Sequence, residues 1–134
     1  MIFIQTEIPD VILVKPTLIE DDRGIFMESY QIEKFKLGGI NCTFVQDNYV
    51  KSAGNILRGL HFQKTKPQGK LVRVIQGSVL DVAVDIRNDS PTYGKHISVL
   101  LSGDNKTMFW IPPGFAHGFS TLENDTIFAY KCSQ

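Results

Sequence analysis

The chain has 134 residues, of which 43% are hydrophobic and 21% charged, and its formal net charge at pH 7 is zero. This length and composition predict a single globular domain over residues 1–134, and no apolar run approaches the roughly 18 to 20 residues that span a bilayer. The zero net charge argues against broad binding to DNA, RNA or anionic membrane.

Short runs rich in Val, Ile, Phe and Thr alternate with glycine and proline along the chain, a spacing typical of an all-β sandwich or barrel. In chain order, the strand candidates are "GIFMESY" (24–30), "TFVQDNYV" (43–50), "ILRGLHFQ" (56–63), "KLVRVIQG" (70–77), "SVLDVAVDIR" (78–87), "HISVLL" (96–101), "TMFWIP" (107–112) and "TIFAYKC" (126–132). The pattern predicts one short helix, "SYQIEKFK" (29–36), which we expect to end before Gly38.

The clearest strand candidate is "SVLDVAVDIR". Its even-numbered positions from Leu80 to Ile86 are apolar, whereas its odd-numbered positions include Asp81 and Asp85. Successive side chains point to opposite faces of a strand. We therefore expect the apolar face to point into the core and the aspartate face to be polar.

The N-terminal segment and the cysteines indicate a cytoplasmic protein. "MIFIQTEIPD" has no basic flank and no small-residue cleavage site. Cys42 and Cys132 are isolated in the sequence, which predicts free thiols instead of a disulfide framework or a thiolate metal site.

Only three histidines are available for chemistry. His117 lies in "WIPPGFAHGF", where prolines and glycines predict a tight turn after a strand, a frame that favours a functional residue. His96 has no such frame, and we expect it at the surface. His61 lies in an apolar stretch, where it is either functional or buried and hydrogen-bonded.

The histidines do not predict a metal site. "IPPGFAH" fits one half of the pattern of metal-binding cupins, but the other half requires a second histidine at the position of Gln63 and a downstream glutamate. No glutamate occurs between Glu33 and Glu123. Two histidines without a carboxylate hold a divalent ion weakly, so we expect neither metal nor cofactor.

The charges are unevenly distributed. No acidic residue lies between Asp47 and Asp81, an interval that holds six cations: Lys51, Arg58, Lys64, Lys66, Lys70 and Arg73. The interval is either a solvated basic face or a site for a small anion.

The strand around His61 limits which of its side chains can contact the same ligand. An ideal strand places Arg58 and His61 on opposite faces. Both side chains can reach one ligand only if the strand bulges, and Gly59 is the residue that permits a bulge.

Six sequence blocks, in order and covering the chain from about residue 10 to its end, resemble the dTDP-4-dehydrorhamnose 3,5-epimerase family of the cupin superfamily. They are "DDRGIFMESY", "FVQDN", "LRGLHFQ", "QGKLVRVIQGSVLDVAVDIR", "SPTYG" and "WIPPGFAHGF". The resemblance implies an all-β, cupin-type jelly-roll barrel (double-stranded β-helix), normally a homodimer without metal, that acts on a nucleoside-diphosphate 4-keto-6-deoxy sugar.

The resemblance also implies the chemistry, which is proton exchange at carbons next to a ketone. His61 matches the family's base, Tyr130 the acid on the opposite face of the sugar, and Lys70 the lysine beside the C4 oxygen. The ammonium suits an enolate, whose charge must be stabilised before the C–H bond can break.

Further matched positions bind the nucleotide sugar. Arg58 matches a phosphate-facing arginine and His117 a residue against the sugar or diphosphate. Asp81 is a supporting residue near Lys70 and His117, either as an ion-pair partner or as an orienting group. Five positions match nucleotide-contacting segments, some across the dimer interface: Arg23, Glu28, Gln46, Asp47 and Asn48.

Members of this family ordinarily continue for several dozen residues beyond the segments matched here. That tail carries an aspartate that hydrogen-bonds the catalytic histidine. Alternative functions are therefore a single-centre epimerase, a 3,4-ketoisomerase, and a truncated or non-catalytic nucleotide-sugar-binding domain.

Overall fold

Residues 1–133, the part of the chain that the computed structural model describes, contain twelve strands and one short helix. The elements are β1 (Ile2–Gln5), β2 (Ile12–Lys15), β3 (Leu18–Asp21), β4 (Gly24–Met27), α1 (Ile32–Leu37), β5 (Phe44–Ser52), β6 (Leu57–His61), β7 (Lys70–Gln76), β8 (Ser78–Asp85), β9 (His96–Ser102), β10 (Met108–Ile111), β11 (Phe115–Thr121) and β12 (Thr126–Ser133).

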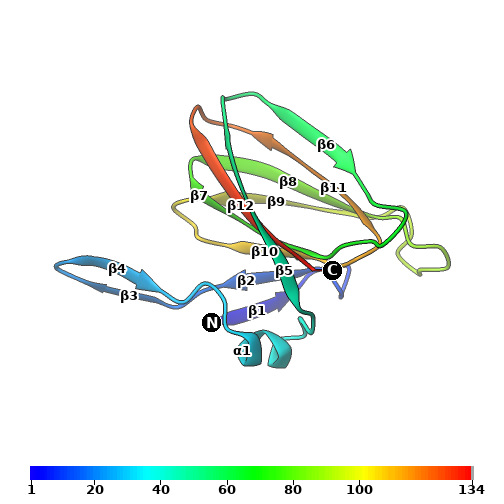
Figure 1. Ribbon diagram of the computed structural model, residues 1–134, viewed down its shortest axis with the longest axis horizontal. Coiled ribbons are helices and arrows are strands. Elements are labelled where there is room, and N and C mark those ends of the chain that lie inside the picture. Colours follow the sequence, from blue (N-terminus) through cyan, green and yellow to red (C-terminus); the bar gives the residue numbers. More distant parts are fainter. Residues whose placement is uncertain (134) are drawn as a thin grey trace.

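The strands form two sheets that face each other and one separate hairpin (Figure 1). The larger sheet has the order β1-β2-β10-β7-β12-β5, and the smaller has the order β6-β11-β8-β9. The β3–β4 hairpin projects away from both sheets. The expected all-β jelly roll with one short helix is confirmed.

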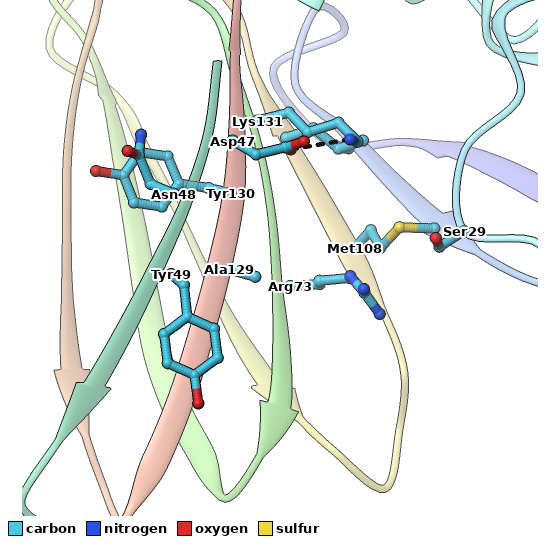
Figure 2. Close-up of a pocket in the computed structure, with 10 residues that line it drawn as sticks. Ser29, Asp47, Asn48, Tyr49, Arg73, Met108, Ala129, Tyr130 and Lys131 are labelled. Carbon is cyan, nitrogen blue, oxygen red and sulfur yellow. Dashed lines mark hydrogen bonds and ion pairs between the residues drawn. The ribbon is translucent and has the colours of Figure 1, made fainter.

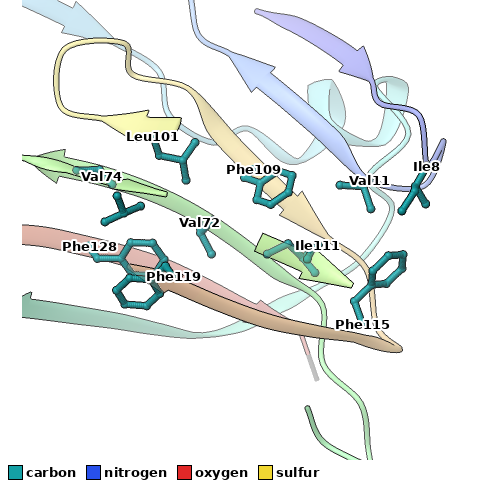
Figure 3. Packing of buried hydrophobic residues seen from close by; sticks show 12 residues of the cluster. Ile8, Val11, Val72, Val74, Leu101, Phe109, Ile111, Phe115, Phe119 and Phe128 are labelled. Carbon is teal, nitrogen blue, oxygen red and sulfur yellow. The ribbon is translucent and has the colours of Figure 1, made fainter. Parts of the chain in front are cut away.

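The main core lies between the two sheets (Figure 3). Val72 and Phe128 of the larger sheet meet Phe119 of the smaller one, and the Phe119 and Phe128 rings stack with centroids 4.1 Å apart. Removing each such side chain from water contributes about 1.5–3 kcal/mol.

A second apolar cluster fixes helix α1 against the outer face of the larger sheet. Phe35 of α1 is fully buried and contacts the Phe3 and Tyr30 rings edge-on or tilted. The helix begins later than expected because Gln31 is extended and its side chain accepts a hydrogen bond from the Lys34 amide at 2.7 Å. No helix within residues 1–133 is long and apolar enough to cross a membrane.

The expected orientation of strand β8 is wrong. Leu80 is 43% exposed, whereas Asp81 and Asp85 are fully buried. Each buried carboxylate has a partner: Asp81 bonds His117, and Asp85 accepts hydrogen bonds from Arg87. Paired charges can occupy an interior that unpaired ones cannot, so the aspartate face points inward.

Candidate active site

A cavity of about 530 Å³ opens between the two sheets. Five strands line it, contributing Val50, Leu57, Arg58, Gly59, His61, Lys70, His117, Gly118, Phe119, Phe128 and Tyr130. His61 comes from the smaller sheet and Tyr130 from the larger one. The two side chains therefore border the cavity from different sheets.

The predicted bulge at Gly59 is confirmed. In the β6–β11 ladder His61 pairs with His117 and Arg58 pairs with Phe119, so three steps along β6 oppose two along β11. Gly59 has φ +99°, and a Cβ atom built there would lie 2.6 Å from the His117 carbonyl oxygen. The bulge brings Arg58 and His61 to one cavity, which a regular strand would not do.

Two cations line this cavity beside the Tyr130 phenol. Arg58 Nη2 donates to Ser52 Oγ at 3.2 Å, and Lys70 Nζ lies 5.7 Å from the centroid of the Tyr130 ring. Within the described residues, no carboxylate lines the cavity. The lining therefore favours an anionic ligand.

Burial raises the pKa of the Tyr130 phenol, and the positive charge of Arg58 opposes that rise. Tyr130 consequently retains its proton at neutral pH. A protonated phenol at a cavity wall can act as a proton donor.

His117 lies within strand β11 and not in the turn that its flanking prolines and glycines suggest. The turn precedes the strand, which begins at Phe115. His117 Nε2 lies 2.7 Å from Asp81 Oδ1, and both side chains are buried. This contact fixes the imidazole at the cavity wall.

Asp81 contacts His117 through one carboxyl oxygen, and its other carboxyl oxygen forms no hydrogen bond within residues 1–133. Its Oδ2 atom is buried and has no hydrogen-bond partner within residues 1–133. Burial raises the pKa of the Asp81 carboxyl, while the charges of His117 and Lys70 oppose the rise. Asp81 therefore acts on the cavity through His117 and Lys70 and does not line the cavity itself.

The candidates on β5 divide between the two faces of the larger sheet. Asn48 points to the same side as Tyr130, and Asp47 points to the other side (Figure 2). Asn48 Nδ2 donates a hydrogen bond to Cys132 Sγ at 3.6 Å, and Asn48 Oδ1 accepts one from Gln46 Nε2 at 3.1 Å. Asp47 instead forms an ion pair with Lys131 at 2.9 Å. Gln46 and Asn48 thus lie on the inner side of β5, whereas Asp47 faces outward.

Arg23 and Glu28 lie outside the cavity of their own chain. Arg23, at the tip of the hairpin, is 90% exposed and pairs with Asp21 at 2.6 Å. Glu28 follows the hairpin and pairs with Lys34 at 2.6 Å. The cavity brings together five of the predicted residues, which are His61, Lys70, Tyr130, Arg58 and His117. Arg23, Glu28 and Asp47 do not line it.

Among the cavity residues that the sequence analysis did not anticipate are two aromatic ones. Phe119 and Phe128 form a stacked wall beside His117 and Tyr130. Each lies two positions from one of those predicted residues on the same strand. The period of two along a strand could have identified both.

Within residues 1–133, no group of three or more His, Cys, Asp or Glu side chains is arranged to hold a metal ion. Cys42 and Cys132 are free, as expected. Cys42 is half-buried and Cys132 is buried.

The family model described as dTDP-4-dehydrorhamnose 3,5-epimerase matches residues 5–134. The chain belongs to this epimerase family. It is 54% identical to the dTDP-4-dehydrorhamnose 3,5-epimerase of Salmonella typhimurium strain LT2 over 135 residues, which cover 99% of this chain and 74% of the relative.

Solved epimerases share the fold. The dTDP-6-deoxy-D-glucose-3,5-epimerase of Legionella pneumophila Philadelphia 1, in complex with dTDP-4-keto-L-rhamnose, superposes with a TM-score of 0.95 at 50% identity. The match covers 98% of this chain and 71% of that one. A 3'-monoepimerase from Streptomyces bikiniensis, in complex with dTDP-quinovose, is more distant, with a TM-score of 0.89 at 28% identity over 97% of this chain and 67% of that one.

Proposed function

We propose that this epimerase converts dTDP-4-dehydro-6-deoxyglucose into dTDP-4-dehydrorhamnose by inverting C3 and C5. The observation that carries the proposal is the convergence of His61, Lys70 and Tyr130 on one cavity from three strands. His61 is the base, Tyr130 the acid and Lys70 the group beside the C4 oxygen.

The inversion requires a base and an acid on opposite faces of the sugar ring. His61 on the smaller sheet takes the proton from carbon, and the C–H electron pair forms the enolate. Tyr130 on the larger sheet then donates its phenolic proton to the other face of that carbon. The carbon gains the opposite configuration and the ketone is restored.

Charge placement supports both the enolate and the nucleotide. The ammonium of Lys70 can stabilise the negative charge that develops on the C4 oxygen. The guanidinium of Arg58 suits a diphosphate oxygen pair, because its planar fork can donate two parallel hydrogen bonds. Asp81 holds His117 at the cavity wall, where the imidazole can contact the sugar or the diphosphate.

Solvent exchange tests the proposal. We expect the protein, incubated with dTDP-4-dehydro-6-deoxyglucose in deuterium oxide, to replace the C3 and C5 protons by deuterium, as followed by NMR. If the nucleotide sugar binds and neither proton exchanges, the epimerase function is refuted.

The same experiment separates the main alternative. The likeness to the 3'-monoepimerase makes inversion at one carbon the second candidate function. Loss of only one of the two proton signals would assign this narrower reaction to the chain.

We further propose that the protein is a cytoplasmic homodimer whose hairpin completes the partner's site. The β3–β4 hairpin exposes apolar side chains on both of its faces, including Ile19, Ile25 and Phe26, and has no sheet of its own to cover them. Its tip carries Arg23, which is suited to a diphosphate. The free cysteines fit the reducing cytoplasm.

Light scattering on the purified protein tests this assembly. We expect a mass of about twice the 15.1 kDa of one chain. We expect Phe26→Lys, which places a charge on the exposed hairpin, to give the monomer mass. A wild-type protein that stays monomeric at assay concentrations would refute the dimer.

A further inference from the structure

A small side chamber adjoins the main cavity. It has a volume of about 90 Å³ and is lined by His61, Phe62, Gln63, Gln68, Lys70, Ile111, Phe115 and His117. His61, Lys70 and His117 line both spaces, whereas Tyr130 lines only the main cavity. The imidazole of His61 therefore borders two compartments.

The proposed reaction changes the protonation of His61 and Tyr130, and both must be restored before a second inversion. Each inversion leaves His61 with an added proton and Tyr130 as a phenolate. Before a second carbon of the same sugar can react, His61 must lose that proton and Tyr130 must regain one. An enzyme that inverts two centres in a single binding event must therefore exchange protons with water while the sugar occupies the main cavity.

We propose that Gln63 and Gln68 hold water in the side chamber, and that this water takes the proton from His61 between the two inversions. The inference rests on the proposed epimerase function. The N–H bond of His61 breaks, the proton passes through the chamber water to bulk solvent, and Tyr130 receives a proton from solvent on the main-cavity side. Gln63 and Gln68 are thus positioning residues that act through water.

The size and chemistry of the chamber fit this role. A volume of about 90 Å³ is enough for a few water molecules. The two glutamine amides offer both donors and acceptors, and an ordered water needs two to four such partners. Ile111 and Phe115 close the other side with apolar surface.

The chamber also has walls that the main cavity lacks. His61 and His117 are paired across the β6–β11 ladder, and both line the chamber together with Phe62 and Gln63, which follow β6. Gln63 occupies the position that holds a second histidine in metal-binding cupins. Here its amide can bind water beside His61.

The test measures deuterium incorporation at the two carbons separately, with enzyme in excess over dTDP-4-dehydro-6-deoxyglucose. In Gln63→Leu and Gln68→Leu, we expect the first carbon to exchange at the wild-type rate and the second at least about tenfold more slowly. Added imidazole buffer should restore the second rate, because a small base can accept the proton in place of the chamber water. Gln5→Leu, on an exposed position of β1 outside both spaces, is the matched control and should match wild type at both carbons.

A conservative variant distinguishes loss of the proton path from loss of the fold. Gln63→Glu retains a polar group that can accept the proton and should keep the second rate near that of wild type. The inference is overturned if the leucine variants exchange both carbons at wild-type rates, slow both equally, or do not respond to imidazole. Absence of exchange in the wild-type protein would instead refute the epimerase function, so the two failures are distinguishable.

Discussion

Gly59 determines where two side chains of the site point. Its positive φ and the closeness of the His117 carbonyl leave no room for a Cβ atom. Gly94 has a comparable φ of +83°, but a Cβ atom there would meet nothing within 4 Å. Alanine substitutions at the two glycines therefore separate the free-energy cost of a positive φ from the cost of the steric contact.

We expect Gly59→Ala to lower the free energy of unfolding by about 2–4 kcal/mol and to abolish exchange, because the bulge that brings Arg58 and His61 together would shift. Gly94→Ala should cost only about 1–2 kcal/mol and leave exchange intact. Urea unfolding and the NMR exchange assay check both. Equal losses in the two variants would contradict the role given to the bulge.

We expect Asp81 to support catalysis and to lower the stability of the folded protein. Burial raises the pKa of its carboxyl, so the fold binds a proton more tightly than the unfolded chain does, and stability falls as pH rises above 3.8. In Asp81→Asn an acceptor for His117 remains, but the charge that acts on His117 and Lys70 is lost.

We expect Asp81→Asn to unfold at pH 7 at the same urea concentration as wild type or a higher one, and to lose at least about tenfold in kcat/KM. The measurements are urea unfolding monitored by tryptophan fluorescence and steady-state epimerisation across pH. A variant that is both fully active and less stable would show that Asp81 is only a structural ion-pair partner.

At the scale of elements, strand β8 shows what the residue pattern can and cannot predict. The period of two correctly separated the face of Leu80 from the face of Asp81. The rule that apolar faces point inward then gave the wrong side. The partners that make burial of Asp81 and Asp85 possible are His117 on another strand and Arg87 beyond the strand end, and no pattern within β8 encodes them.

The loop after β8 depends on Asp85. Its carboxylate accepts hydrogen bonds from the Arg87 guanidinium and from the hydroxyls of Ser90 and Thr92. Arg87 contributes most to holding the pKa of this carboxyl well below its ordinary value of 3.8. A lowered pKa means that the contribution of Asp85 to stability is fully present above about pH 5 and is lost as pH falls below about 4.

We expect Asp85→Asn to lower the free energy of unfolding at pH 7 by about 2 kcal/mol and to reduce the loss of stability on acidification. Asp10 pairs with the same Arg87 but is exposed, so Asp10→Asn should cost less than about 1 kcal/mol. Urea unfolding at pH 7 and pH 3 provides the comparison. An Asp85→Asn protein with the acid sensitivity of wild type would refute this assignment.

At the scale of the whole molecule, the projecting hairpin explains why some expected site residues stand apart. His61, Lys70 and Tyr130 meet because the jelly roll brings β6, β7 and β12 around one cavity. Their convergence followed from family resemblance and not from spacing, since Tyr130 lies far from the other two in sequence. Arg23 lies on the hairpin outside the cavity of its own chain, and in the proposed dimer it would reach the partner's cavity.

Mixing two inactive variants tests that composite site. If Arg23 acts across the dimer, Arg23→Ala and His61→Ala should each be inactive or strongly impaired, and mixing them should regenerate one intact site per mixed dimer. With random exchange of subunits, we expect about a quarter of the wild-type activity. No gain on mixing, after exchange is verified by labelled subunits, would show that Arg23 does not act in trans.

The central claim is that His61 removes the proton from carbon. The most direct measurement is deuterium exchange at C3 and C5 of dTDP-4-dehydro-6-deoxyglucose in His61→Ala, beside His96→Ala, whose histidine is exposed on β9 outside the cavity. We predict that His61→Ala keeps its fold and nucleotide binding and loses exchange at both carbons by about 10²-fold or more, whereas His96→Ala exchanges like wild type. A folded His61→Ala protein that exchanges either carbon at the wild-type rate would contradict the assignment of the base.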